Sequence, residues 1–295
     1  MSEAIVTPKK QVKERKSGPW RDGWRSFKKN KIALIGAMLV LFFVSLAIFG
    51  PLLAPQGINE QMLANKLQPP SAEHWFGTDD LGRDVYSRVI LGARISLLVG
   101  FLSVIASAIV GSFLGIMAGY YGRWIDTIIS RLFDILLAFP SILLAIAIVA
   151  VLGPSLQNAL IAIAIINVPN FGRLIRSRVL SIKEEEYITA AKAIGMSDRR
   201  ILFSHILPNA MTPIIVQGTL AIATAIIEAA ALGFLGLGAQ PPQPEWGKML
   251  ADARSYFITA PWTMIFPGLS IMLVVLGFNL MGDGLRDAFD PKMKN

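Results

Sequence analysis

Cysteine is absent from this 295-residue sequence, and only two histidines occur, His74 and His205. Without cysteine the chain can form neither a disulfide framework nor a thiolate metal site. The two histidines are far apart in sequence, and the topology derived below places them on opposite sides of a membrane. The sequence therefore offers no metal-ligand cluster and no hydrolytic triad, and we predict no metal site.

A nucleotide-binding loop is also lacking. No G-x-x-x-x-G-K-[ST] segment is present, and Gly247-Lys248 lacks the upstream glycine that this motif requires. We therefore predict that the chain holds no ATP and no cofactor of its own, and that it is not an enzyme by itself.

Charged residues are scarce, at 16% of the sequence, while 54% of the residues are apolar. A soluble domain has about 25% charged residues. The apolar residues fall in blocks long enough to cross a bilayer, for which about 20 residues suffice. We therefore predict an all-α polytopic membrane protein with six transmembrane helices. The expected spans are 32–54, 95–121, 127–152, 156–172, 211–235 and 261–284, with a kink at Pro140 and an interruption at Pro169.

The basic residues predict the orientation of these spans. With both termini inside, 22 of the 28 Lys and Arg residues lie on the cytoplasmic side, as the positive-inside rule requires. Ten of them lie in residues 1–31, so this tail explains most of the net charge of +8 without nucleic acid as a partner. In the tail, Trp20, Trp24 and Phe27 recur at helical spacing, which favours an amphipathic helix in the lipid headgroup layer over a disordered tail.

Three polar residues lie inside the predicted spans and are candidates for a translocation path. Glu228 has no partner nearby in sequence, and an ionisable group near mid-bilayer costs at least ~2.5 kcal/mol on insertion scales. Its carboxylate either faces a water-filled path or hydrogen-bonds a neighbouring helix end, and the sequence leaves both open. Asn167 and Asn279 are more often helix–helix contacts than substrate ligands.

Two segments are expected outside the membrane. In 236–260, three prolines preclude a regular helix, so we expect a folded hairpin or partial re-entry that ends in a short helix from about Glu245. In 54–94 we expect a network of paired charges, with a structural role in first place and docking of an external partner in second: Asp79, Asp80, Arg83, Asp84 and Arg88.

The segment YITAAKAIGMSDRRILFSHILPN, residues 187–209, interrupts the apolar runs on the cytoplasmic side. Residues 183–194 and 198–206 each suit a short helix, with Gly195 between them. Ser197 is placed to cap the second helix, and Pro208 to start the next span. A plain solvated loop usually lacks such ordered spacing, so we predict a helix–turn–helix projection. Its small residues form a face that another protein's cleft can enclose: Ala190, Ala191, Ala193 and Gly195.

This segment resembles the cytoplasmic loop of the permeases of binding-protein-dependent ABC importers, whose pattern is E-A-A-x3-G-x9-I-x-L-P. Thr189 replaces the Glu and His205 replaces the Ile, while the other positions are kept: Ala190, Ala191, Gly195, Leu207 and Pro208. Three further segments look like the dipeptide/oligopeptide/nickel group, and more closely like its C-type subunit: HWFGTDDLGRDVYSRVILGARISL (74–97), ALGFLGLGAQPPQPEWGKML (231–250) and FNLMGDGLRDAFDPK (278–292). The match covers about Phe27 to Lys292.

The resemblance implies a type I ABC importer permease fold in a bacterial or archaeal cytoplasmic membrane. The implied partners are a homologous second permease chain, two ATP-binding subunits that hold ATP and Mg²⁺, and an external substrate-binding protein. The resemblance also implies that the loop couples the chain to an ATPase subunit through seven residues: Thr189, Ala190, Ala191, Gly195, His205, Leu207 and Pro208.

The domain organisation expected from the resemblance has four parts. They are a basic tail (1–31), a first helix with an external loop (32–94), a core permease domain (95–285) that contains the loop at about 183–208, and a C-terminal tail (286–295). The implied function is import of dipeptides or short peptides. Nickel, glutathione-like compounds and longer oligopeptides are the alternatives, and an ion-coupled secondary transporter with Glu228 as its ion site is a distant one.

Overall fold

The computed structural model describes residues 19–289, except for the side chains of residues 19, 20 and 22. The basic residues Lys9 to Lys16, the side chain of Trp20 and the tail beyond residue 289 lie outside the described residues. The described chain is helical and contains no β-strand. Five of its helices are long and apolar enough to cross a membrane, or six spans result if one bent helix pair counts as a span. This confirms the predicted all-α polytopic fold.

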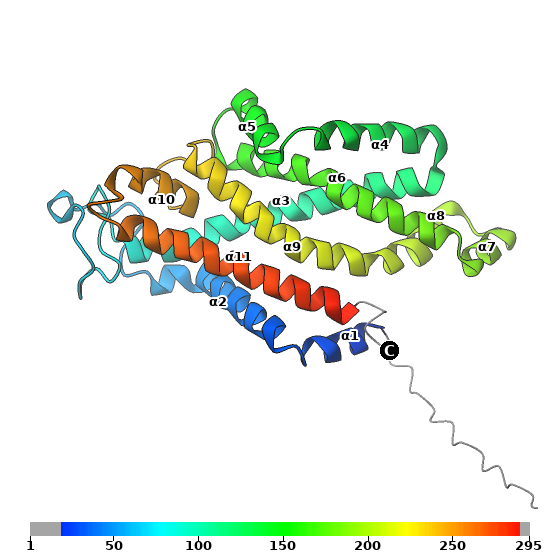
Figure 1. Ribbon diagram of the computed structural model, residues 1–295, viewed down its shortest axis with the longest axis horizontal. Coiled ribbons are helices and arrows are strands. Elements are labelled where there is room, and N and C mark those ends of the chain that lie inside the picture. Colours follow the sequence, from blue (N-terminus) through cyan, green and yellow to red (C-terminus); the bar gives the residue numbers. More distant parts are fainter. Residues whose placement is uncertain (1–18, 290–295) are drawn as a thin grey trace, which may run out of the picture.

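The long helices run along an elongated bundle (Figure 1). They are α2 (Lys31–Leu53), α3 (Val85–Tyr121), α4 (Arg123–Leu137), α6 (Leu156–Lys183), α9 (Leu207–Phe234) and α11 (Trp262–Phe289). The shorter α5 (Ser141–Leu152) lies across this direction.

Short elements lie toward the two ends of the bundle. Toward one end lie α1 (Pro19–Phe27), α7 (Glu186–Ala193), α8 (Asp198–Ile201) and η2 (Leu202–Ile206). The other end carries η1 (Leu63–Asn65), α10 (Trp246–Ala253) and η3 (Arg254–Tyr256). Because Lys and Arg concentrate on the side of α1 and α7, the positive-inside rule assigns that end to the cytoplasm. We call the two ends the cytoplasmic end and the external end.

The third predicted span, 127–152, consists of two helices and not of one kinked helix. α4 and α5 meet at 93°. Proline disfavours helical geometry at the residue before it and cannot donate to the preceding turn. Pro140 therefore ends the first helix, and α5 begins anew at Ser141. α4 lies along α6, where Asp126 accepts two hydrogen bonds from Arg176 at 2.5 and 2.7 Å, and Asp134 pairs with Arg173 at 2.6 Å.

Two other predicted boundaries were wrong. α6 continues through the buried Pro169 to Lys183 and does not end near residue 172, because its neighbours α3 and α9 cover the disturbed turn. α3 begins at Val85 and not near residue 95. The predicted span was charge-free and began after Arg94, whereas α3 also contains Arg94 and the buried Arg88, whose charge is compensated by Asp79 at 3.6 Å.

Glycines set the close packing of the long helices. A Cβ atom at Gly111 of α3 would lie 2.5 Å from the Val168 carbonyl oxygen of α6, and one at Gly119 would lie 2.9 Å from the Val179 Cβ atom. The two helices therefore approach at a distance that only glycine permits. The main apolar core extends from this contact to α9, α10 and α11 and includes the fully buried Phe171 and Trp246.

The predicted N-terminal helix is present as α1, but its two described aromatic side chains differ in exposure. Trp24 is exposed and stacks on Phe27, while Phe27 is buried in a small cluster with Ala33 and Ala288. Phe27 thus ties α1 to the end of α11. The location of α1 in the headgroup layer stays a prediction.

Candidate coupling site

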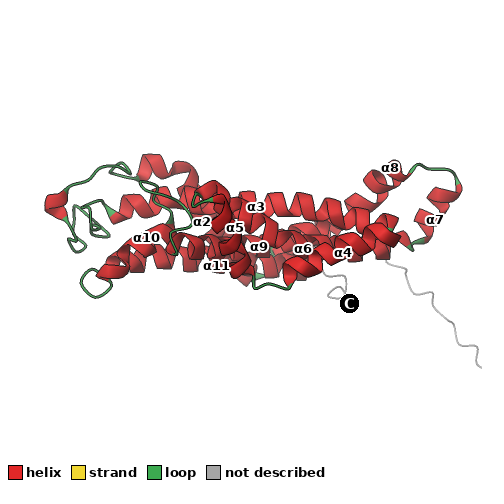
Figure 2. Ribbon diagram, turned by 90° about the horizontal axis from the view of Figure 1, so that it is seen from above, coloured by secondary structure: helices red, strands yellow, loops and turns green. Residues whose placement is uncertain are grey.

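The cytoplasmic segment between α6 and α9 projects beyond the ends of the other helices (Figure 2). It consists of α7, a turn at Gly195, α8 and the π-helical η2. This confirms the predicted helix–turn–helix. We call residues 184–206 the coupling segment.

An apolar cluster of its own holds the coupling segment against α3 and α6. Ile188, Ile201 and Ile206 are fully buried and pack with Tyr120 of α3 and with three residues of α6: Ile175, Val179 and Ile182. Ala191 is 6% exposed and belongs to the same cluster. The prediction that Ala191 lies on the exposed face was therefore wrong. Ala191 follows Ile188 by three residues, and such pairs share one face of a helix.

The outer face of α7 is open to solvent and consists mostly of small side chains. Thr189, Ala190, Ala193 and Gly195 are exposed. Ile194 is 80% exposed at the end of this face. The sequence reasoning missed Ile194, although an isoleucine beside a turn glycine in a polar cytoplasmic segment was a usable signal. An exposed apolar tip with a small-residue flank suits insertion into a partner's cleft.

Gly195 ends α7 in a Schellman motif. Its amide donates to the Lys192 carbonyl at 2.9 Å, and the Met196 amide donates to the Ala191 carbonyl at 3.1 Å. The motif needs a positive φ, and the φ of Gly195 is +79°. Ser197 occupies the predicted N-cap position of α8, but its side chain makes no capping hydrogen bond.

The segment joins α9 through a π-helical turn. The Leu207 amide donates to the Leu202 carbonyl, and Pro208 then provides no amide hydrogen. Asn209 donates its side-chain amide to the His205 carbonyl at 2.6 Å. The half-buried His205 ring lies 6.0 Å from the ring of Tyr187 in α7.

Glu228 is 8% exposed and lies in the bundle interior. Its Oε2 atom accepts a hydrogen bond from Asn167 Nδ2 at 3.0 Å, and the Ser141 hydroxyl also interacts with this carboxylate. The contacts join α9 to α6 and to the first residue of α5. Asn279 is exposed on α11, and its side chain has no hydrogen-bond partner among residues 19–289. The three predicted polar residues therefore do not form one site. Asn167 and Glu228 are hydrogen-bonded to each other, whereas Asn279 lies on the exposed side of α11.

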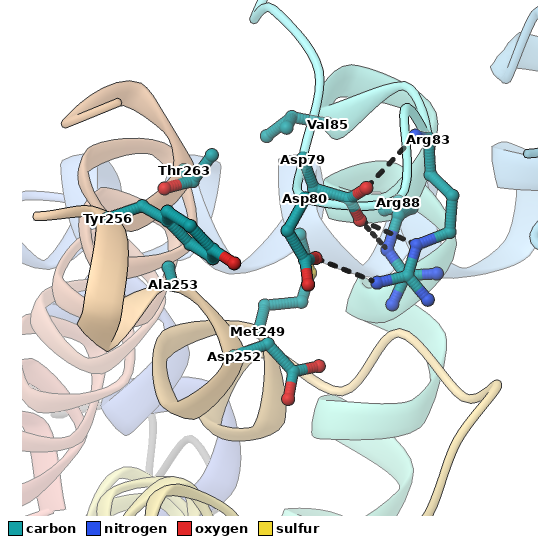
Figure 3. A pocket seen from close by; sticks show the side chains of 10 residues that line it. All are labelled: Asp79, Asp80, Arg83, Val85, Arg88, Met249, Asp252, Ala253, Tyr256 and Thr263. Carbon is teal, nitrogen blue, oxygen red and sulfur yellow. Dashed lines mark hydrogen bonds and ion pairs between the residues drawn. The ribbon is translucent and has the colours of Figure 1, made fainter. Parts of the chain in front are cut away.

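The predicted charge network is present at the external end (Figure 3). Arg83 contacts Asp79 at 2.6 Å and Asp80 at 3.7 Å, and Arg88 contacts Asp79 at 3.6 Å. These side chains line a cavity of about 20 Å³ together with Asp252 of α10. Burial and the neighbouring Asp79 raise the pKa of the Asp80 carboxyl. The network thus joins the external loop, α3 and α10.

Asp84 does not belong to this network, contrary to the prediction. Its Oδ1 atom lies 3.0 Å from His74 Nδ1, and its Oδ2 atom accepts from both the amide and the hydroxyl of Ser87 at 2.7 Å. The carboxylate therefore caps the start of α3, which explains why it turns away from the arginines.

Two buried residues at the start of α10 were not singled out from the sequence. Glu245 accepts hydrogen bonds from the amides of Gly247 and Lys248, both at 2.8 Å, and burial raises the pKa of its carboxyl. Trp246 is fully buried, and its indole Nε1 donates to the Val89 carbonyl at 2.9 Å. The predicted short helix from about Glu245 is confirmed, and these two side chains anchor it to α3.

The fold and the coupling segment define a multi-pass α-helical permease of the kind that works in ABC importers. Residues 111–295 match the family described as "binding-protein-dependent transport system inner membrane component". Residues 18–70 match the family described as "N-terminal TM domain of oligopeptide transport permease C". The chain belongs to the family of binding-protein-dependent transport system inner membrane components.

Several characterised proteins are similar to this chain. The dipeptide transport system permease protein DppC of Alkalihalophilus pseudofirmus is 66% identical over 277 residues, with 94% of this chain and 91% of that protein covered. The di/tripeptide transport system permease protein DppC of Pseudomonas aeruginosa is 51% identical, with 94% and 93% covered. The glutathione transport system permease protein GsiD of Pectobacterium atrosepticum is 48% identical, with 94% and 92% covered.

A solved structure has the same fold. The methionine ABC transporter MetNI, in an inward-facing conformation, matches with a TM-score of 0.52 at 20% identity, over 68% of this chain and 95% of that chain. The family description and the bacterial relatives support a multi-pass protein of a bacterial inner membrane. They give no support to the archaeal alternative.

Proposed function

We propose that this chain is a membrane-spanning subunit of an ATP-driven importer of dipeptides or short peptides, and that α7 is its coupling helix. One observation carries the coupling role: α7 is held out at the cytoplasmic end with a small-residue outer face and the 80% exposed Ile194 at its tip. A separate apolar cluster holds the base of α7, so a partner can grip the outer face without unfolding the segment.

The proposed assembly contains this chain, a homologous second permease chain, two ATP-binding subunits and an external substrate-binding protein. ATP and Mg²⁺ are bound by the ATP-binding subunits. The membrane-component family description supports the external partner and the division of labour. In this assembly, α7 sits in a groove of one ATP-binding subunit. Thr189, Ala190 and Gly195 contact the groove, and Leu207 and Pro208 hold the angle at which the coupling segment leaves α9.

Transport follows from alternating access. Closure of the ATP-binding pair moves the coupling segment, and the helices on either side of it, α6 and α9, move with it. The bundle then changes from inward-open to outward-open, and the external binding protein delivers its cargo to the open side.

The proposed cargo is a dipeptide or short peptide, since two of the relatives named above carry dipeptides or di/tripeptides. A glutathione permease is 48% identical, so a glutathione-like tripeptide is the second candidate. The family description matched by residues 18–70 names oligopeptide transport, so longer oligopeptides are the third candidate, and none of the relatives named above is described as a nickel permease. A binding assay with the cognate external binding protein, using dipeptides, glutathione and nickel as competing ligands, identifies the cargo.

The coupling role is tested in the full importer reconstituted in liposomes. Ala190→Arg places a bulky charge on the outer face of α7, and we expect loss of peptide uptake and of the stimulation of ATP hydrolysis by loaded binding protein. Ser26→Arg adds the same charge to the exposed face of α1 and serves as the matched control. Unchanged uptake and stimulation in Ala190→Arg contradict the proposal.

A further inference from the structure

A tyrosine at the cytoplasmic end of α3 contacts the coupling segment and its base. Tyr120 lies in the last turn of α3 and is 6% exposed. Its hydroxyl donates to Asp198 Oδ1 at 2.6 Å. Its backbone carbonyl accepts from Lys183 Nζ at 3.0 Å, and the Lys192 ammonium lies 5.5 Å from its ring centroid.

These contacts join α3 to three other elements. Asp198 begins α8, Lys183 ends α6 and Lys192 lies in α7. Within residues 19–289, the bond from Tyr120 to Asp198 is the single hydrogen bond between α3 and the coupling segment. A 2.6 Å bond from a hydroxyl to a carboxylate has the length of a charge-assisted hydrogen bond, which is roughly twice as strong as a neutral one.

α3 reaches from this contact to the opposite end of the molecule. It is one uninterrupted helix of 37 residues, which corresponds to a length of about 55 Å at about 1.5 Å per residue. Near its other end, Arg88 belongs to the external charge network. A displacement of the cytoplasmic end of α3 is therefore carried to the external loop and α10.

We propose that Tyr120 is the positioning residue through which movement of α7 and α8 reaches α3 and, with it, the external end. The inference rests on the proposed role of α7 as coupling helix. The chain itself connects α7 and α8 only to α6 and α9. Without the bond from Tyr120 to Asp198, α3 is joined to the coupling segment only by apolar contacts and by the Lys192 ammonium over the Tyr120 ring, and these contacts are less directional than a hydrogen bond.

The test uses the complete importer in liposomes and compares Tyr120→Phe with Tyr121→Phe. The first variant keeps the buried ring and removes only the hydroxyl. The second removes the hydroxyl of the neighbouring, exposed tyrosine and is the matched control. We expect Tyr120→Phe to keep assembly and basal ATP hydrolysis and to raise the ATP consumed per peptide imported roughly tenfold, the factor for one hydrogen bond to a charged group.

A double-mutant cycle identifies the bond itself. Asp198→Asn removes the charge of the acceptor. We expect the double variant with Tyr120→Phe to couple ATP hydrolysis to peptide uptake as well as the more poorly coupled of the two single variants does. Additive losses would overturn the inference. If Tyr120→Phe fails to assemble, the same comparison with Asp198→Asn alone decides, because that variant leaves the whole tyrosine in place.

A distance measurement gives a readout that a merely stabilising role does not move. The chain contains no cysteine, so spin labels on Tyr121→Cys and Glu186→Cys report the distance between the end of α3 and α7. We expect one narrow distance throughout the ATP cycle, and a broadened one in the presence of Tyr120→Phe. An unchanged narrow distance contradicts the inference.

If Ala190→Arg uncouples and Tyr120→Phe does not, only this inference fails; if neither uncouples, the proposed coupling role fails.

Discussion

The side-chain amide of Asn167 on α6 donates to the carboxylate of Glu228 on α9 at 3.0 Å, inside the helix bundle. The same carboxylate interacts with Ser141 at the start of α5. One acidic side chain thus joins three helices at the point where the broken span turns.

Replacing Glu228 by leucine is expected to destabilise the bundle by about 1–3 kcal/mol, because the buried Asn167 amide loses one of its two acceptors and keeps only the Ile163 carbonyl. Glu228→Gln keeps an acceptor oxygen and should cost less. Thermal unfolding of the purified assembly measures both changes, with Asn279→Leu on the exposed side of α11 as control. If Glu228 lines the path and binds cargo, Glu228→Gln instead changes the KM for peptide uptake at unchanged stability.

Gly195→Ala is expected to weaken the end of α7 by about 1–2 kcal/mol, since a residue with a Cβ atom is strained in the left-handed conformation. No atom lies within 4 Å of the added Cβ, so backbone strain is the whole effect. Hydrogen exchange should therefore increase in residues 186–200 and not in α6. Gly218→Ala, at a helical glycine with equally open surroundings, is the control and should leave exchange unchanged or slower. Equal protection of α7 in both variants contradicts the Schellman assignment.

Asp80→Asn is expected to stabilise the assembly at neutral pH. The pKa of Asp80 is raised in the folded chain, so its carboxyl favours folding while protonated, and this contribution is lost as the pH rises through the folded pKa. The melting temperatures of variant and parent should therefore converge near the ordinary pKa of about 3.9 and separate at higher pH.

Asp79→Asn should act in the opposite direction, because it removes the carboxylate that contacts both buried arginines, which leaves Arg88 without its ion pair and Arg83 with only the longer contact to Asp80. Breaking a buried pair in this way costs about 3–5 kcal/mol. Thermal unfolding at pH 7 distinguishes the two variants by sign, and a lower melting temperature for Asp80→Asn than for the parent contradicts the assignment.

Trp246→Ala is expected to detach α10 from α3. The fully buried indole fills the core beside Phe43, and a substitution of this kind costs about 3–5 kcal/mol. Trp246→Phe keeps much of the volume but removes the hydrogen bond from the indole to the Val89 carbonyl, so an intermediate loss is expected. Limited proteolysis between residues 236 and 260 measures the detachment. Trp124→Phe on the exposed side of α4 is the control and should behave like the parent.

The sequence predicted the helix–turn–helix correctly because its determinants are local. Gly195 and Pro208 each dictate backbone geometry within a few residues, whatever the rest of the chain does. The side on which Ala191 lies was mispredicted. Its burial depends on the cluster with Ile175 and Tyr120, which are distant in sequence.

Ion pairs between residues that are distant in sequence could not be predicted either. The predicted span began after Arg94 and so left out Arg88, whose partner Asp79 belongs to a loop that folds back on the start of α3. Glu245 was predicted only as a helix start and Trp246 was not singled out, because the residues next to them in sequence do not indicate that α3 and α9 enclose them.

By itself, the sequence predicted the membrane class, the orientation and the position of the cytoplasmic projection, and it contains no G-x-x-x-x-G-K-[ST] motif. Hydropathy, basic-residue counts and motifs are properties of short stretches, so they can be read without a fold. Only the tertiary structure decided that Tyr120 bonds Asp198, that Glu228 pairs with Asn167, and that the third span breaks at 93°. These features depend on which helices become neighbours. Close helix packing at glycines, together with hydrogen bonds and ion pairs inside the bundle, determines that arrangement.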